Sequence, residues 1–174
     1  MVMSARLPSP VVTAVSVIAA CVGVAGCSST YIPNTDVPDT PENRDVIAFC
    51  ETYRKAVERR DALAMLQMTS PAYYEDGGNP DASDDMDFVQ FKKWLTGESI
   101  NETGVSFQDA SAIRHEIRYR RVLRGEERIF VDYTYSASFK VPTSYGEQWK
   151  RKVEDNRLEL VLDESGELKV IAGM

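Results

Sequence analysis

Apolar residues in the first half of the chain recur at three- and four-residue steps, which is the spacing of an amphipathic helix. This spacing predicts helices over residues 41 to 60, 61 to 70 and 88 to 97. Thr40 and Pro41 suit the start of the first helix, because a hydroxyl caps free N–H groups and proline lacks one. The apolar face of this helix consists of Val46, Ile47, Phe49, Cys50, Tyr53 and Val57.

In the second half the apolar period changes from 3.6 to 2, which predicts half-buried strands. Alternation runs over residues 113 to 120, 129 to 140 and 149 to 162, and a last strand carries Leu168 and Val170. The connections are short, so neighbouring strands should be antiparallel. The sequence therefore predicts an α+β fold in which N-terminal helices precede a four-stranded meander.

The longest apolar stripes of the two halves should meet in the core. These residues are Tyr53, Val57, Val131, Tyr133 and Tyr135. Asp132 should face the other side of the sheet, because adjacent strand residues point in opposite directions. Cys50 shares the apolar face of the first helix and should be a buried thiol.

Composition places the chain among ordinary globular domains. It has 174 residues, 43% hydrophobic and 27% charged, with 20 basic and 27 acidic side chains. The formal charge of −7 argues against nucleic-acid binding, which needs a surplus of Lys and Arg. No nucleotide, redox or covalent-catalysis motif is present, so we expect no cofactor.

The N-terminus carries Arg6 and then an apolar run over residues 11 to 26. A run of this length is short for a membrane-spanning helix, which needs about 20 residues, and is typical of a signal peptide. It ends in Val24-Ala25-Gly26-Cys27, and polar residues follow. An ordinary secretory signal is the alternative, and either Met1 or Met3 can be the start.

This segment resembles a bacterial lipoprotein signal. The resemblance implies a signal peptide over residues 1–26, a lipid anchor on Cys27, and a flexible tether over residues 27–40. It implies a place in the bacterial cell envelope, and Ser28 after the cysteine favours the outer membrane. Cys50 would then be the one cysteine left for the folded domain, without a disulfide partner.

The order of elements, with the segments 53–63 and 70–76, resembles the nuclear-transport-factor-two-like superfamily, which includes SnoaL-like cyclases and ketosteroid isomerases. The resemblance covers residues 41–174. It implies a single cone-like domain in which a strongly curved sheet wraps the first helix and leaves a pocket at its open end. Members include enzymes and binding proteins, and the resemblance leaves open whether this chain forms a homodimer. Fold alone does not decide between these functions.

Two groups are candidates for proton transfer. Asp76 follows Tyr73 and Tyr74, near the pocket that the resemblance implies; burial would make it a general base, and the Tyr74 hydroxyl would stabilise an enolate. His115 shares the inward strand face and would titrate near neutral pH. The simpler interpretations are a solvated turn at Asp76 and a hydrogen-bonded core histidine at His115.

Other charged groups favour a structural interpretation. The acids between Asp76 and Asp87 lack the spacing of a calcium loop, and His115 alone cannot form a zinc site, so we expect no metal. The basic residues of the first strands should form the polar outer face of the sheet. These are Arg114, Arg118, Arg120, Arg121, Arg124 and Arg128.

We therefore expect a membrane-anchored envelope lipoprotein that binds a small apolar ligand or an envelope protein partner without catalysis. The alternative is a SnoaL-type lyase, isomerase or hydrolase that uses Asp76 and His115. A pocket where these side chains converge would favour the enzyme, and a filled cone with an exposed apolar sheet face would favour a protein partner.

Overall fold

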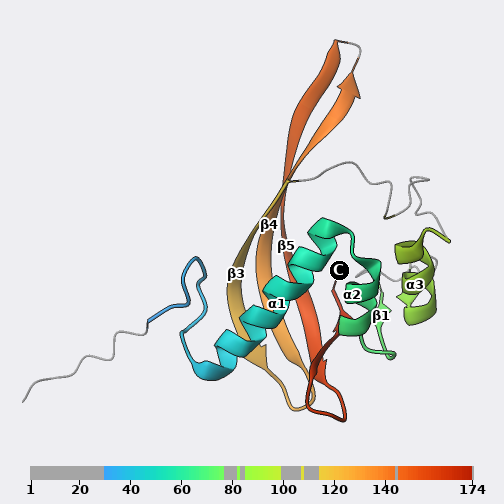
Figure 1. The fold of residues 1–174 in the computed structure, drawn as a ribbon. Helices are drawn as coiled ribbons and strands as arrows, with labels where there is room; N and C mark the ends of the chain where they lie inside the picture. Colours follow the sequence, from blue (N-terminus) through green and yellow to red (C-terminus); the bar gives the residue numbers. More distant parts are fainter. Residues whose placement is uncertain are drawn as a thin grey trace, which may run out of the picture.

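A computed structural model describes residues 30–76, 82, 85–98, 107, 114–143 and 145–173. The helices are α1 (Pro41–Arg59), α2 (Ala62–Met68) and α3 (Phe88–Thr96). Helix α1 lies across one face of the sheet, α2 lies beside the C-terminal end of α1, and α3 lies next to α2 (Figure 1). Within the described part of the chain, no helix has both the length and the apolar character needed to cross a membrane.

Each predicted helix is confirmed, and a side chain caps the N-terminus of each. The Thr40 hydroxyl accepts a hydrogen bond from the backbone N–H of Asn43 at 3.2 Å, and Asp61 accepts from Ala64 at 3.0 Å. Asp87 and Gln90 form a reciprocal capping box at the start of α3. These polar contacts fix the helix ends close to where the sequence places them.

The sheet is the expected antiparallel meander, with strand order β3-β4-β5-β6. Its strands are β3 (Arg114–Arg124), β4 (Ile129–Thr143), β5 (Gly146–Leu162) and β6 (Leu168–Ala172). Register shifts occur in β3 between Tyr119 and Arg121 and in β5 between Glu159 and Leu160. Such bulges increase the bend and twist of a sheet. The β4–β5 hairpin projects beyond the helices (Figure 1).

Three details differ from the sequence expectations. Strand β5 begins at Gly146, before Trp149, because the pairing with β4 continues to Thr143. Pro142 therefore lies in a strand and not in the turn. Leu162 continues the alternation of Leu158 and Leu160, which predicts burial, but as the last residue of β5 it is exposed.

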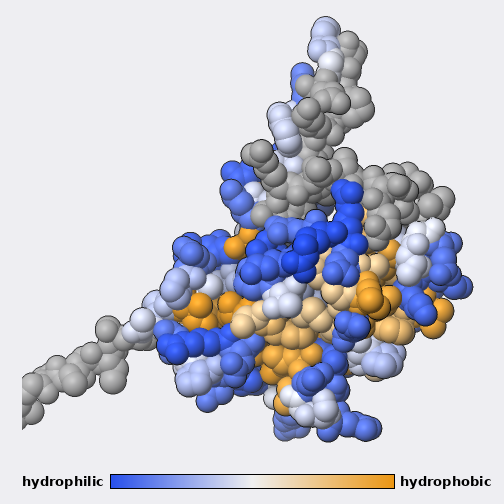
Figure 2. Space-filling view, in the orientation of Figure 1, coloured by the Kyte–Doolittle hydropathy of each residue, from blue (hydrophilic) through white to orange (hydrophobic). Residues whose placement is uncertain are grey.

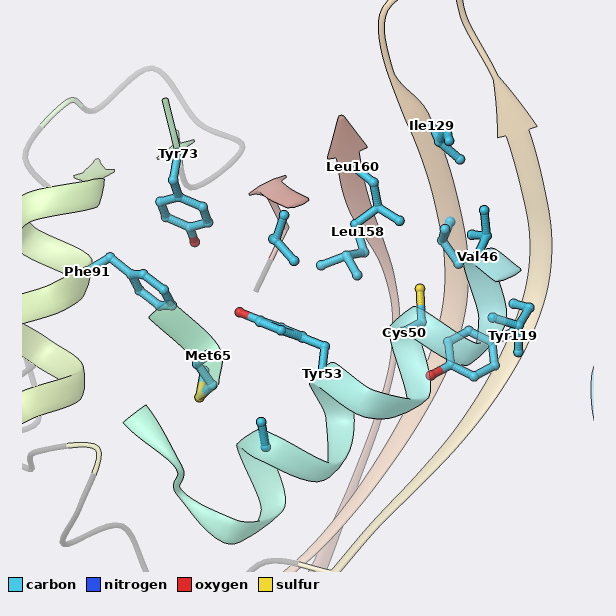
Figure 3. Packing of buried hydrophobic residues seen from close by; sticks show 14 of the residues in the cluster. Val46, Cys50, Tyr53, Met65, Tyr73, Phe91, Tyr119, Ile129, Leu158 and Leu160 are labelled. Atoms are coloured by element: carbon cyan, nitrogen blue, oxygen red, sulfur yellow. The ribbon is translucent and has the colours of Figure 1, made fainter. Parts of the chain in front are cut away.

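The core lies between α1 and the sheet. Val46, Cys50 and Tyr53 of the helix belong to the same buried cluster as Val131 and Leu160 of the strands (Figure 3). Helix α3 adds Phe91, whose ring stacks on Tyr73 with centroids 4.7 Å apart. The expected burial of Cys50 and Val131 is confirmed.

The segment from Thr30 to Asp39 is not the free tether that the sequence suggested. Val37 is completely buried, and the backbone N–H of Asp36 donates to the carbonyl of Tyr119 at 2.9 Å. The Asp36 carboxylate forms ion pairs with Arg118 and Arg120 of β3. Apolar anchoring and opposite charge thus hold this loop on the sheet edge, and the packed domain begins before residue 41.

The outer face of the sheet is polar, as expected. Asp132 points to the opposite face of the sheet from its neighbour Val131 and forms ion pairs with Arg121 at 2.6 Å and Arg157 at 2.7 Å. Arg128, in the turn before β4, pairs with Glu159 of β5. Arg121, Arg128 and Arg157 are therefore part of charge pairing between neighbouring segments of the sheet.

Candidate functional site

A cavity of about 360 Å³ lies between the C-terminal half of α1 and the inner face of the sheet. Its wall is mainly apolar and aromatic. It is lined by Cys50, Tyr53, Arg54, Val57, Ile117, Tyr119, Tyr133, Tyr135, Ala137, Lys152, Asn156, Leu158 and Gly173. On the face seen in Figure 2, apolar side chains gather over α1 and α2 with hydrophilic side chains around them.

Four tyrosines form much of this wall, one from α1 and three from the strands. The rings of Tyr119 and Tyr133 are 6.5 Å apart between centroids and inclined by 57°, so they form two sides of a corner. The Tyr119 hydroxyl donates to Glu51 at 2.9 Å, and the Tyr135 hydroxyl donates to Glu154 at 2.7 Å. Two hydroxyls are thus held by carboxylates, while their rings line the cavity.

Burial keeps these phenols neutral. It raises the pKa of both Tyr133 and Tyr135 to about 12, and it raises the pKa of Tyr119 further. The Tyr53 hydroxyl is buried and has no hydrogen bond of acceptable geometry among the described residues, although Thr69 lies near it. Neutral rings make the wall a surface for apolar and aromatic groups.

The two cations of the wall are already paired. The Arg54 guanidinium binds Glu51 in two places, at 3.0 and 2.9 Å, and also pairs with Glu58. The Lys152 ammonium pairs with Glu154. Although burial opposes it, hydrogen bonds from Arg54 and Tyr119 lower the pKa of Glu51 below its ordinary value. Hydrogen bonds, first from Lys152 and then from Tyr135, also lower the pKa of Glu154.

Gly173 closes one side of the cavity, and its position requires glycine. Its φ is +89°, and a Cβ there would lie 1.8 Å from the carbonyl oxygen of Arg157. Its backbone N–H donates to the carboxylate of Glu75 in the short strand β1 (Tyr74–Glu75), which pairs with β2 (Met86–Asp87). After burial, the charge of Glu75 contributes to the raised pKa values of Tyr73 and Tyr133.

Cys50 lies on the cavity wall without a disulfide partner among the described residues. Burial, and then the charge of Glu51, raise its pKa to about 12. The thiol is therefore protonated at neutral pH, which is unsuited to a nucleophile.

The structure does not bring the predicted acid and tyrosine into this cavity. Asp76 is exposed and does not line it, and Tyr74 is 52% exposed with its hydroxyl donating to Asp85. Their neighbours Tyr73 and Glu75 point to the inside instead, because successive extended residues alternate between faces. The two candidates from the sequence, Tyr74 of β1 and Asp76 just after it, therefore lie on the outward face of this segment.

The third candidate is placed only by its backbone. His115 lies in β3 opposite Ala137, and its side chain lies outside the described part of the structure. Of the acidic run, Asp81 and Asp84 also lie outside the described residues. Among the residues that are described, no group of three His, Cys, Asp or Glu side chains is arranged to hold a metal ion.

The tyrosine wall was missed as a site by sequence reasoning. Its signal was present, because Tyr133 and Tyr135 stand on the inward side of the alternation, but these residues were assigned to a closed core. Tyr119 joins them only through the fold.

No protein-family model matches the chain, and no curated protein sequence matches it. Solved structures do. A conserved protein from Planctomyces limnophilus has a TM-score of 0.56 and 8% identity over 76% of this chain and 92% of its own. A ketosteroid isomerase-like protein from Erwinia carotovora has a TM-score of 0.53 and 11% identity over 78% of this chain and 95% of its own.

A third similar structure is a calcium/calmodulin dependent protein kinase II association domain from Xanthomonas campestris, with a TM-score of 0.51 and 14% identity over 82% and 94% of the two chains. The chain has the cone-like fold of these proteins. The α+β class with a curved antiparallel sheet is thus confirmed. At these identities the likeness concerns the fold and not the activity.

Proposed function

We propose that this domain binds a small, largely apolar ligand in the cavity between α1 and the sheet, without catalysing a reaction. The observation that carries the proposal is the wall itself, in which tyrosine rings and aliphatic side chains surround a space of about 360 Å³. Ligand sites are typically concave, apolar and marked by a few polar groups. A cone with such a space supports a small ligand over a protein partner.

The alternative is a SnoaL-type lyase, isomerase or hydrolase, which the likeness to a ketosteroid isomerase-like protein keeps open. Proton transfer needs an acid or base within reach of the ligand. No carboxylate or imidazole stands among the described residues of the wall. Exposure of Asp76 further weakens this alternative, and His115 is the remaining group on which it depends.

The binding proposal is tested with a bulky residue placed in the cavity. Val57 lines the cavity, whereas Val153 is exposed and does not line it. Val57→Trp should fill the space and lower the affinity for a neutral fluorescent probe, N-phenyl-1-naphthylamine, by at least about tenfold. Val153→Trp, the matched control, should bind the probe like the original chain.

Fluorescence titration of both variants, with melting curves to verify folding, decides the question. Equal loss in both variants, or none in Val57→Trp, would mean that the probe binds elsewhere. Turnover of an isomerase substrate that disappears in His115→Ala would favour the enzyme.

We also propose that the chain is anchored in the bacterial envelope by a lipid on Cys27. The support is the sequence Val24-Ala25-Gly26-Cys27 at the end of an apolar run. Cys27→Ser should move the protein from the membrane pellet to the soluble or unprocessed fraction, because the lipid supplies the apolar anchor. Retention of a processed Cys27→Ser chain in the pellet after a high-salt wash would contradict the anchor.

A further inference from the structure

The arrangement of charges around the cavity bears on which ligand it accepts, and this step rests on the proposed function. Arg54 and Lys152 are the two cations of the wall. Three carboxylates surround them: Glu51 and Glu58 bind Arg54, and Glu154 binds Lys152. The balance of these five groups is negative by one unit, and the whole chain has a formal charge of −7.

An anionic ligand meets an unfavourable arrangement here. To reach the Arg54 guanidinium it has to compete with Glu51, which holds two of its nitrogen atoms, and with Glu58. To reach Lys152 it has to approach Glu154. In both places a second negative charge would lie beside a carboxylate that is already hydrogen-bonded, and like charges at close range repel.

A cationic ligand meets two wall cations, Arg54 and Lys152, whose repulsion is offset because each is paired with a carboxylate. The faces of tyrosine rings attract cations, and Tyr119 and Tyr133 form an inclined corner in the wall. The hydroxyl groups of Tyr119 and Tyr135 donate hydrogen bonds to Glu51 and Glu154. These carboxylates place negative charge behind both rings and increase the attraction of the rings for a cation. Aliphatic side chains such as Leu158 and Val57 then cover the apolar body of the ligand.

We infer that the cavity selects a small organic ammonium ion with an apolar or aromatic body, held by the faces of the tyrosine rings and by the negative charge of Glu51 and Glu154. The remote carboxylates attract the ammonium group without touching it. The rings make the contact. The cavity therefore discriminates ligands by charge while keeping an apolar lining.

Three probes with one skeleton test this selection: 2-phenylethylammonium, neutral 2-phenylethanol and anionic phenylacetate. They are titrated by calorimetry into the full chain in zwitterionic detergent, with empty micelles subtracted. The ammonium should bind about tenfold more tightly than the alcohol, and phenylacetate should bind most weakly. Val57→Trp should weaken all three, which verifies that they occupy the cavity.

Two carboxylate variants locate the effect. Glu154→Gln keeps a hydrogen-bond acceptor for Tyr135 but removes the charge, so the affinity for the ammonium should fall several-fold while that for the alcohol stays unchanged. Glu159→Gln on the same strand is the matched control, because Glu159 pairs with Arg128, which does not line the cavity, whereas Glu154 contacts Lys152 and Tyr135 of the wall. Glu51→Gln should expose the charge of Arg54 and shift the preference toward phenylacetate.

The outcomes separate the two proposals. If the alcohol binds as tightly as the ammonium, or phenylacetate binds more tightly, the charge selection is wrong and the apolar binding site stands. If none of the probes binds, both the charge selection and the proposed function fail. An equal effect of Glu154→Gln and Glu159→Gln would also overturn the inference, since it would reduce the effect to the overall charge of the protein.

Discussion

The two halves of α1 face the same sheet but meet it in different ways. In the N-terminal half, Val46 joins Val131 and Leu160 in a core from which water is excluded. In the C-terminal half, Val57 faces a cavity of about 360 Å³ and is only partly buried. Cys50 belongs to both, since it is part of the buried cluster and also lines the cavity.

The difference arises from the side chains of the sheet rather than from the helix, whose apolar spacing is the same throughout. Opposite the first half, branched aliphatic residues fill the space. Opposite the second half stand Ala137, which is small, and tyrosines such as Tyr135 that are held at the hydroxyl by a carboxylate. A ring held at its far end cannot collapse into a gap, so an unfilled space next to it is kept open. The same apolar pattern of α1 thus packs into a closed core in one half and lines a cavity in the other.

The largest effect should come from a charge placed in the closed half. Val131→Asp puts a carboxylate in a completely buried position and should cost several kcal/mol, enough to unfold a domain of typical stability, about 5–15 kcal/mol. Ala137→Asp in the open half should cost less than half as much, because the carboxylate faces the cavity and its cross-strand partner is Lys152. Denaturant melts of both full chains measure the difference. Equal losses would mean that the open half is as closed as the other.

A smaller effect is expected on the outer face. Asp132→Ala removes the carboxylate that bridges Arg121 and Arg157 and should cost about 1 kcal/mol, at the upper end for surface ion pairs. This compares inner and outer faces at adjacent residues. A loss as large as that of Val131→Asp would contradict the assignment of faces.

The same variant carries a pH signature. The hydrogen bond from Arg157 lowers the pKa of Asp132 below its ordinary value of 3.8 in the folded chain. A lowered folded pKa means that the stabilisation is complete above the ordinary value and is lost as the pH falls below it toward the folded value. Asp132→Ala should therefore reduce stability at pH 7 and make the acid side of the stability curve less steep. Parallel curves for both proteins would contradict this.

The smallest effect tests the boundary between the halves. The Cys50 thiol has its pKa raised to about 12 by burial, so its alkylation by iodoacetamide at pH 8 should be slower than in denaturant by at least about a hundredfold. Mass spectrometry of the Cys50 peptide gives this rate apart from the other cysteines. Alkylation of the native chain as fast as the denatured one would mean that water and reagent reach the thiol freely through the cavity.

The sequence predicts the elements well because their signals are local. The cap at Thr40 and the change of period near residue 113 each depend on a few neighbouring residues. Because the turns between consecutive strands are short, neighbouring strands pair as an antiparallel meander. The docked loop near Val37 escaped prediction because its polar and proline-rich composition conceals a single buried anchor.

The site is less predictable because it depends on distance between elements. Whether Tyr133 fills a core or lines a cavity depends on how far α1 stands from the sheet, which bulges such as that between Tyr119 and Arg121 influence. The choice between Glu75 and Asp76 depends on which face of a two-residue strand turns inward, and pairing with β2 decides this. Neither the distance between α1 and the sheet nor the pairing of β1 with β2 can be predicted from a short stretch of sequence.

The edge strands of the sheet, β3 and β6, affect how copies of the protein can associate. At edge strand β3, the backbone N–H of Asp36 donates a hydrogen bond to the carbonyl of Tyr119. At edge strand β6, the backbone N–H of Ser70 donates to the carbonyl of Val170, and Thr69 forms a parallel bridge with Val170. Open strand borders invite intermolecular strand addition and aggregation. Here a segment of the chain blocks each of these two edge strands in the middle, so strand addition at β3 and β6 is hindered. At these two strands, contacts between copies would depend on side chains rather than on free backbone groups.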